Sequence, residues 1–98
     1  MDSWQRQIIM KQLDKLVEET DCNDLLLAKL YPVFSKCDVD TLKARRSSMS
    51  GISASFMLYE MLVTRTNGYE ILKKALEETK QTGVLALITS GETDFMYT

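Results

Sequence analysis

Histidine is absent from this chain of 98 residues, which removes the side chain that most often serves as a general base or a metal ligand. Only two cysteines are present, Cys22 and Cys37, and they are too far apart in sequence for a paired-thiolate zinc motif. No glycine-rich phosphate loop and no G-x-S-x-G nucleophile turn occurs. We therefore expect no enzymatic activity, no metal and no cofactor within these residues.

Signals for secretion and membrane insertion are also missing. The opening stretch MDSWQRQ carries an acid and amides where a signal peptide needs a basic start and an apolar run. Unbroken apolar runs are only a few residues long, far short of the roughly 20 residues that span a bilayer. We expect a cytoplasmic protein in which Cys22 and Cys37 are free, buried thiols.

A basic excess is lacking as well. The formal net charge is −2, whereas a surface that binds nucleic-acid phosphates normally carries an excess of lysine and arginine. With one proline, four glycines and 45% hydrophobic residues, the chain has little room for a long flexible segment and is too apolar to be disordered. These properties predict one small globular domain that binds neither nucleic acid nor a membrane.

Apolar residues recur at helical spacing in six segments, and no alternating run long enough for a strand is present. In the first segment Ile9, Leu13 and Leu16 follow the i, i+4, i+7 pattern of one buried face. The fourth segment is apolar around much of its circumference, which indicates a central position. Residues suited to cap or open a helix begin the segments. These residues are Ser3, one of Asp21, Cys22 and Asn23, then Asp38, Ile52 or Ser53, Asn67 and Thr82.

Local chemistry predicts where several helices end. Pro32 disfavours helical torsions at the preceding residue, so the second helix should end or kink there. The small polar residues of 47–51 are typical of a loop, and Arg65 is expected to close the fourth helix.

The last two helices are predicted in the same way. Asn67 followed by Glu70 approximates a capping box at the start of the fifth helix. Gly91 is expected to end the sixth helix. The prediction is therefore a helical domain over residues 1–91, followed by a tail or the start of a linker over residues 92–98.

Two alternatives stay open for methionine and tryptophan. Met49, Met57 and Met61 could form an adaptable groove, or they could fill the core, which is the commoner role of methionine on an apolar helix. The groove would make the chain a small helical regulator that binds a peptide helix. Trp4 could anchor the first helix in the core or remain exposed as a contact residue.

Charge placement is the remaining candidate for function. Acidic residues open the second and third helices, while basic residues lie on the first helix and end the fourth. If the helices form a bundle, the two signs are expected on different faces, and such a surface can bind a copy of itself head-to-tail. Each charge could equally serve only to solvate its helix or to complement the helix dipole. The candidate partner-binding residues are Arg6, Lys11, Lys15, Asp21, Asp24, Asp38, Asp40 and Arg65.

Two stretches resemble the caspase recruitment domain (CARD) of the death-fold superfamily. The segment LYEMLVTRTNGYEILKKALEETKQTGVLALI is similar to the family's leucine-rich fourth helix, basic turn, aromatic helix start and ALxxTxxxxLxxLL run, with Tyr69 in the aromatic position. The segment IIMKQLDKLVEETDCNDLL is similar to the first helix of such domains in arthropod initiator caspases, through LxxLVxxT over residues 13–20. Together the similarity covers residues 4–90.

The resemblance implies a six-helix antiparallel bundle of the death-fold type that associates with another CARD or death-fold protein, or with copies of itself in a filament. It also implies that the domain recruits and clusters signalling proteins in apoptosis. Within the family, the resemblance favours the prodomain of an initiator caspase that docks on an apoptosome-type scaffold, and a domain of an innate immune adaptor or receptor is the near alternative. The chain departs from the family at residues 65–68, where Arg-Gly-Pro is common, and at Pro32, where a longer helix is usual.

Overall fold

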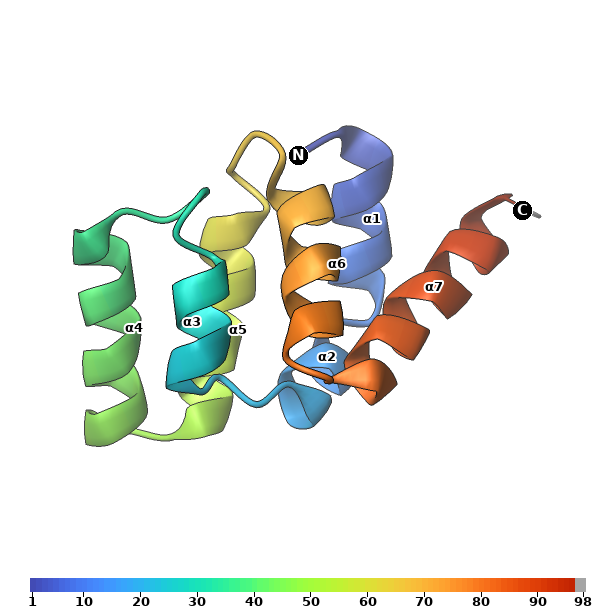
Figure 1. Ribbon diagram of the computed structural model, residues 1–98. Helices are drawn as coiled ribbons and strands as arrows, with labels where there is room; N and C mark the ends of the chain where they lie inside the picture. Colours follow the sequence, from blue (N-terminus) through green and yellow to red (C-terminus); the bar gives the residue numbers. More distant parts are fainter. Residues whose placement is uncertain (97–98) are drawn as a thin grey trace.

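Seven α-helices form from residues 1–96, the part of the chain that this computed structural model describes (Figure 1). No β-strand occurs in that part, so the predicted all-α class is confirmed, although there are seven helices instead of six. None of these helices combines the length and the apolar character needed to cross a bilayer. The helices are α1 (Ser3–Lys11), α2 (Leu13–Glu19), α3 (Asp24–Lys29), α4 (Lys36–Ser48), α5 (Gly51–Leu62), α6 (Gly68–Glu78) and α7 (Thr82–Met96).

The first predicted helix differs from the structure at its start and in its middle. Asp2, and not Ser3, takes the N-cap position of α1. Gln12 interrupts the helix with φ −124° and ψ 29°, and its backbone N–H bonds to the carbonyl oxygen of Ile9 at 3.3 Å. Ile9 and Leu16, on either side of this break, are both fully buried. The apolar spacing thus continues through the break, which is why the sequence predicts one helix where the structure has α1 and α2.

The start of α4 also differs from the prediction, because Ser35 and not Asp38 is its N-cap. The Ser35 hydroxyl accepts the backbone N–H of Asp38 at 3.1 Å, and the Asp38 carboxylate accepts the backbone N–H of Ser35 at 3.0 Å. This reciprocal capping box satisfies two backbone donors. The preceding helix, α3, fits the prediction better: Asn23 caps it by accepting the N–H of Leu26 at 2.8 Å, and it ends before Pro32.

The predicted loop at residues 47–51 is reduced to Met49 and Ser50, because α4 continues to Ser48 and α5 begins at Gly51. The Ser50 hydroxyl caps α5 by accepting the backbone N–H of Ser53 at 3.0 Å. A serine can be either a helix cap or a residue of a loop, so a run of serines does not determine where a helix starts.

The turn between α5 and α6 contains two further corrections. Arg65 does not close α5, which ends at Leu62, but lies in the turn that follows. Asn67 adopts a left-handed conformation with φ 62° and makes no side-chain capping bond. Glu70, its expected partner, instead accepts a hydrogen bond from Gln5 of α1 at 3.1 Å. The predicted capping box is therefore absent, and its acid joins α6 to α1.

The prediction that Gly91 ends the last helix is wrong, because α7 continues to Met96. A Cβ atom at residue 91 would lie 2.9 Å from Cγ2 of Ile8, so this glycine allows α7 to approach α1 closely. Residues 92–96 of the predicted tail are helical, and residues 97 and 98 lie outside the described residues.

The core is formed by apolar side chains from all seven helices. Met57 and Met61 pack at its margin, as the core-filling alternative predicts, whereas Met49 is exposed. Trp4 is neither fully buried nor isolated: 39% of its surface is exposed, and its ring lies edge-on to Tyr69 with centroids 5.4 Å apart. The largest fully buried side chains are Tyr59, Ile9, Leu16, Leu26, Leu27, Leu30, Leu42, Leu58, Leu62, Leu72, Leu76 and Ile88.

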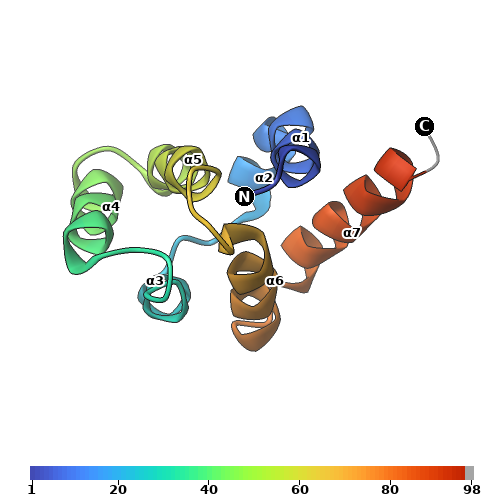
Figure 2. The same cartoon turned by 90° about the horizontal axis from the view of Figure 1, so that it is seen from above.

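The order of the helices across the molecule determines which surfaces are separate. Viewed from above, α4 and α5 lie on one side, α1 and α2 lie in the middle, and α7 lies on the other side (Figure 2). α7 packs against α1, α2 and α6, while α5 packs against α2 and α4. The pair α1–α2 therefore separates α5 from α7.

Candidate interaction surface

Four of the eight predicted partner-binding residues form ion pairs within the chain. Asp38 binds Arg65 at 3.0 Å, Asp24 binds Arg46 at 2.6 Å, and Asp40 lies 3.9 Å from Lys36. The hydrogen bond from Arg46 lowers the pKa of Asp24, and the hydrogen bond from the Ser35 backbone lowers the pKa of Asp38. The expectation that acids and bases occupy different faces is thus wrong for Asp38 and Arg65, which bind each other.

The predicted acidic residues are also divided between the two ends of the bundle. Asp38 lies in the first turn of α4, whereas Arg46, the partner of Asp24, lies in its last turn. Eight residues of α-helix correspond to about 12 Å along the axis. Figure 1 shows the same separation, because α3 starts at the end of the bundle where α4 finishes. Asp21 and Asp24 therefore do not form one patch with Asp38 and Asp40.

Three predicted cations behave differently. Arg6, Lys11 and Lys15 are exposed, and none of them forms an ion pair with a residue of the described chain. We call them the unpaired cations. Asp21 is the comparable acid: its carboxylate accepts the amide of Asn23 at 3.2 Å and forms no ion pair with a described residue. Unpaired charges at the surface keep their full capacity to attract a partner of opposite sign.

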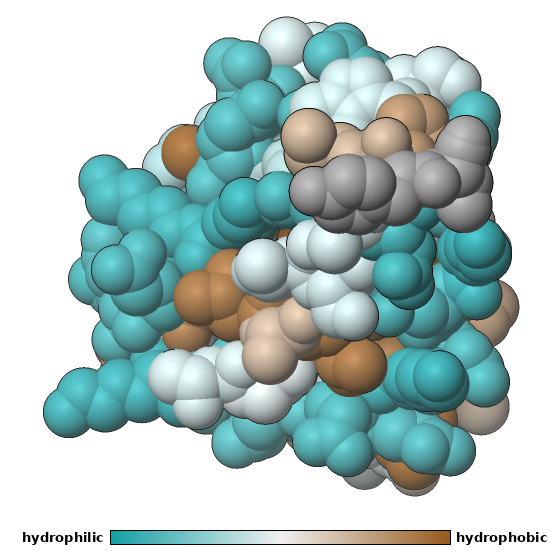
Figure 3. Space-filling view, turned by 90° about the vertical axis from the view of Figure 1, so that its right-hand side faces the viewer, coloured by the Kyte–Doolittle hydropathy of each residue, from teal (hydrophilic) through white to brown (hydrophobic). Residues whose placement is uncertain are grey.

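Two of the unpaired cations line a hollow between α1 and α7. We call this pocket of about 310 Å³ the α1–α7 groove. The side of the molecule on which α7 lies faces the viewer in Figure 3, and apolar surface is visible there between hydrophilic margins. The lining residues of the groove are Gln7, Ile8, Lys11, Gln12, Lys15, Gly91, Asp94 and Phe95.

The α7 wall of the groove was missed by sequence reasoning. Asp94 and Phe95 belong to the predicted tail, because Gly91 was expected to end the helix. A signal was present: Ile88, Gly91 and Phe95 continue the i, i+3, i+7 spacing of one helix face. Glycine at this position allows close packing of two helices and does not end the helix. The sequence alone does not distinguish these two roles of glycine.

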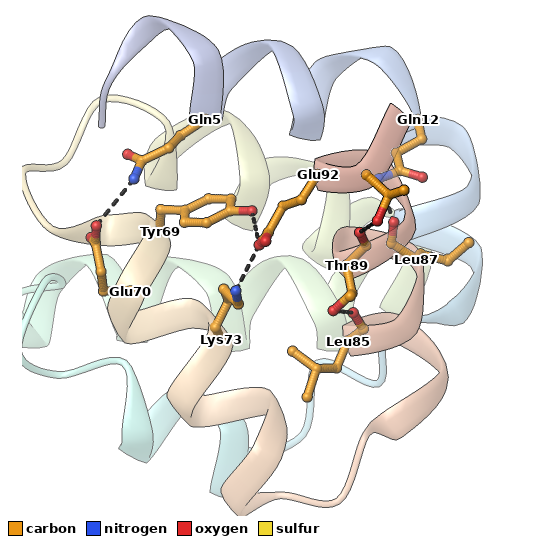
Figure 4. Close-up of polar contacts among 10 residues, drawn as sticks. Gln5, Gln12, Tyr69, Glu70, Lys73, Leu85, Leu87, Thr89 and Glu92 are labelled. Carbon is orange, nitrogen blue, oxygen red and sulfur yellow. Dashed lines mark hydrogen bonds and ion pairs between the residues drawn. The ribbon is translucent and has the colours of Figure 1, made fainter. Parts of the chain in front are cut away.

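Polar contacts hold α7 in place beside α1 and α6 (Figure 4). Glu92 of α7 accepts hydrogen bonds from the Tyr69 hydroxyl at 2.5 Å and from the Lys73 ammonium group at 2.6 Å. On the other side, the Gln12 amide donates to the carbonyl oxygen of Leu87 at 2.8 Å. These bonds, together with the core contacts of α7, fix the width of the groove.

The charge of Glu92 is maintained by its partners. Partial burial acts to raise its pKa, but the hydrogen bonds from Lys73 and Tyr69 outweigh that effect, and the pKa lies below its ordinary value. Burial and the adjacent carboxylate raise the pKa of Tyr69, so this hydroxyl remains a donor. The contact between α6 and α7 therefore depends on an ionised Glu92.

The thiols were also predicted only in part. Both cysteines are free, and Cys22 is buried, which raises the pKa of its thiol to about 11. Cys37 is exposed, contrary to the expectation, because it lies in the first turn of α4 on the side away from the core. Within residues 1–96 no three cysteine, aspartate or glutamate side chains converge as a metal site.

No protein-family model, no curated protein and no solved structure matches this chain. Its function is therefore inferred from the arrangement of its own residues.

Proposed function

We propose that this chain is a homotypic protein–protein interaction module of the CARD type, within the death-fold superfamily, and that it has no catalytic activity of its own. Its partner is another CARD or death-fold protein, or further copies of itself. Within this class we favour the prodomain of an initiator caspase that docks on an apoptosome-type scaffold in the cytoplasm. The alternative within the class is the domain of an innate immune adaptor or receptor that forms helical filaments.

The all-helical architecture supports this proposal. If α1 and α2 are counted as one bent helix, six helices remain. Residues that carry the resemblance are structural ones: Leu16 and Val17 of the LxxLVxxT run are buried, as are Leu76 and Ile88 of the ALxxTxxxxLxxLL run. The resemblance thus concerns the frame of the domain, and the binding specificity belongs to its charged exterior.

The observation that carries the proposal is the set of unpaired cations, Arg6, Lys11 and Lys15. Among residues 1–96 the ion pairs involve other charges, so these three are left for a partner. Charges across an interface steer encounter and select the partner more than they add affinity. A module that clusters in this way raises the local concentration of whatever is linked to it, which converts a second encounter into an intramolecular one.

The proposal is tested by light scattering coupled to size-exclusion chromatography. We expect concentration-dependent self-association, or mixed complexes with other death-fold domains, that weakens as salt is raised because screening affects exposed charges. The double variant Lys11→Glu/Lys15→Glu should abolish this association. A matched control is Lys43→Glu/Lys80→Glu, which changes the net charge equally at two lysines that line no part of the groove and form no ion pair with a described residue.

Two outcomes would count against the proposal. A wild-type protein that remains monomeric at all salt and protein concentrations, and that binds no other death-fold domain, would contradict the proposed function. Equal loss of association in the double variant and its control would show dependence on net charge alone, and not on the unpaired cations.

A further inference from the structure

α5 exposes an apolar and acidic stripe that the proposed function has not used. Ile52 and Phe56 are 58% and 44% exposed, although both are large apolar side chains. Glu60 follows one turn later, is exposed, and forms no ion pair with a described residue. Because the three residues are spaced at i, i+4 and i+8, they lie along one face of α5. We call this face the α5 stripe.

The α1–α7 groove is complementary to this stripe in both polarity and charge. Its exposed apolar lining is the Phe95 ring, 42% exposed, while Ile8 lies buried at its base and Gly91 adds no side chain. Its charged lining consists of Lys11, Lys15 and Asp94, so two cations and one anion leave an excess of one positive charge. A ligand with an apolar side chain followed by a carboxylate fits this lining, and the α5 stripe presents that order.

We propose that the α5 stripe of one copy docks into the α1–α7 groove of a second copy. The Phe56 ring packs against the Phe95 ring, and the Glu60 carboxylate pairs with Lys11 or Lys15. This inference rests on the proposed function, because it names the two surfaces through which copies of the chain associate. Aromatic burial supplies most of the affinity of such a contact, and the ion pair fixes its register and partner.

The contact can form only between molecules. α1 and α2 separate α5 from α7, so the stripe of a chain cannot reach the groove of the same chain (Figure 2). The two surfaces differ, so the contact is heterologous: each copy that binds through its stripe still has an empty groove. Such contacts propagate into rings or open filaments instead of stopping at a dimer.

A charge exchange between two variants tests the pairing. Glu60→Lys alone and Lys11→Glu/Lys15→Glu alone should each remain monomeric at concentrations where the wild type assembles. An equimolar mixture of the two variants should assemble again, because each stripe then meets a groove of opposite charge. Light scattering measures all three samples, and circular dichroism verifies that each variant retains its helical content and melting temperature.

Asp94 provides a variant with the opposite effect. It is an anion in a groove that receives an acidic stripe, so Asp94→Asn should lower the concentration of half-assembly several-fold. Glu77→Gln, on the exposed side of α6 and outside the groove, is the matched control and should leave that concentration unchanged.

The outcomes separate this inference from the proposed function. If Glu60→Lys assembles like the wild type while Lys11→Glu/Lys15→Glu does not, the groove binds another surface, and the inference fails while the proposed function stands. Failure of the mixture to assemble, when each variant alone is folded and monomeric, would also overturn the pairing. A wild-type protein that never associates overturns both.

Discussion

At the scale of single residues, two glycines at equivalent positions have different structural roles. Gly51 and Gly68 are the first residues of α5 and α6, respectively. A Cβ atom at residue 68 would lie 2.8 Å from the carbonyl oxygen of Leu62, and a backbone atom cannot move aside as a flexible side chain can. A Cβ atom at residue 51 would have no neighbour within 4 Å.

This difference predicts the effects of two identical substitutions. Gly68→Ala should lower the free energy of unfolding by about 1–3 kcal/mol, the usual cost of forcing a methyl group into a packed site. Gly51→Ala should be neutral or stabilising by up to about 1 kcal/mol, because it only restricts the unfolded chain. Urea denaturation of both variants measures the difference. Equal unfolding free energies would mean that the close approach at Gly68 does not constrain the turn.

Residue-level chemistry was predictable where it was local in sequence. A helix start within residues 21–23 and an end before Pro32 depend on neighbours within four positions, and both predictions are confirmed; of the three candidate caps, the structure uses Asn23. Asp38 is the predicted cap of α4, but the observed N-cap is Ser35, three residues earlier, and Asp38 is its partner in the capping box. Several residues near one helix start can cap it, and the packing of the helix decides among them.

At the scale of helices, the attachment of α7 is sensitive to pH. The pKa of Glu92 is lower in the folded protein than its ordinary value of 4.5, so ionisation of Glu92 stabilises the fold. This contribution is fully present above the ordinary pKa and is lost as the pH falls through the lower, folded-state pKa. We expect the wild type to lose stability below about pH 4.5 more steeply than Glu92→Gln, which has no carboxylate to protonate.

The measurement is a series of thermal or urea unfolding curves of both proteins between pH 3 and pH 7, with buffers of constant ionic strength. Glu77→Gln serves as a control, since Glu77 is exposed on α6 and has no ion-pair partner among the described residues. Parallel pH profiles for the wild type and Glu92→Gln would show that the Tyr69–Glu92–Lys73 contact does not depend on charge.

The helical type of the elements and the place of most of them followed from periodicity, whereas their exact number and their ends did not. The helical spacing of leucines is strong enough to place α5, α6 and most of α7 without tertiary information. The division of α1 from α2 at Gln12 was invisible because the buried positions continue through it. The extension of α7 beyond Gly91 was missed because glycine near a helix end is usually a stop signal.

At the scale of the whole molecule, the partners of charged groups could not be read from the sequence. Asp38 and Arg65 are 27 positions apart and meet only because the turn after α5 lies over the start of α4. The sequence predicts that both are important but not that each neutralises the other. The α1–α7 groove is likewise a product of packing, since its two walls come from opposite ends of the chain.

The charges of the whole molecule therefore fall into two classes with separable effects. Arg65 pairs with Asp38, and its guanidinium lies 5.8 Å from the centroid of the Phe34 ring, so it is part of the fold. The unpaired cations contact no acid of the described chain and are expected to contribute to association only. Arg65→Glu should lower the melting temperature even in a dilute, monomeric sample, because it places a second carboxylate beside Asp38.

Lys11→Glu/Lys15→Glu should leave the melting temperature of the dilute monomer close to that of the wild type while preventing assembly. Differential scanning calorimetry at low concentration and light scattering at high concentration give the two readouts for each variant. The control is the double variant Asp38→Arg/Arg65→Glu, which exchanges the two charges and lets an ion pair form again. It should recover part of the melting temperature that Arg65→Glu loses. If the Lys11→Glu/Lys15→Glu monomer is destabilised, those lysines contribute to the fold, as Arg65 does. The groove would then have no free positive charge for a partner.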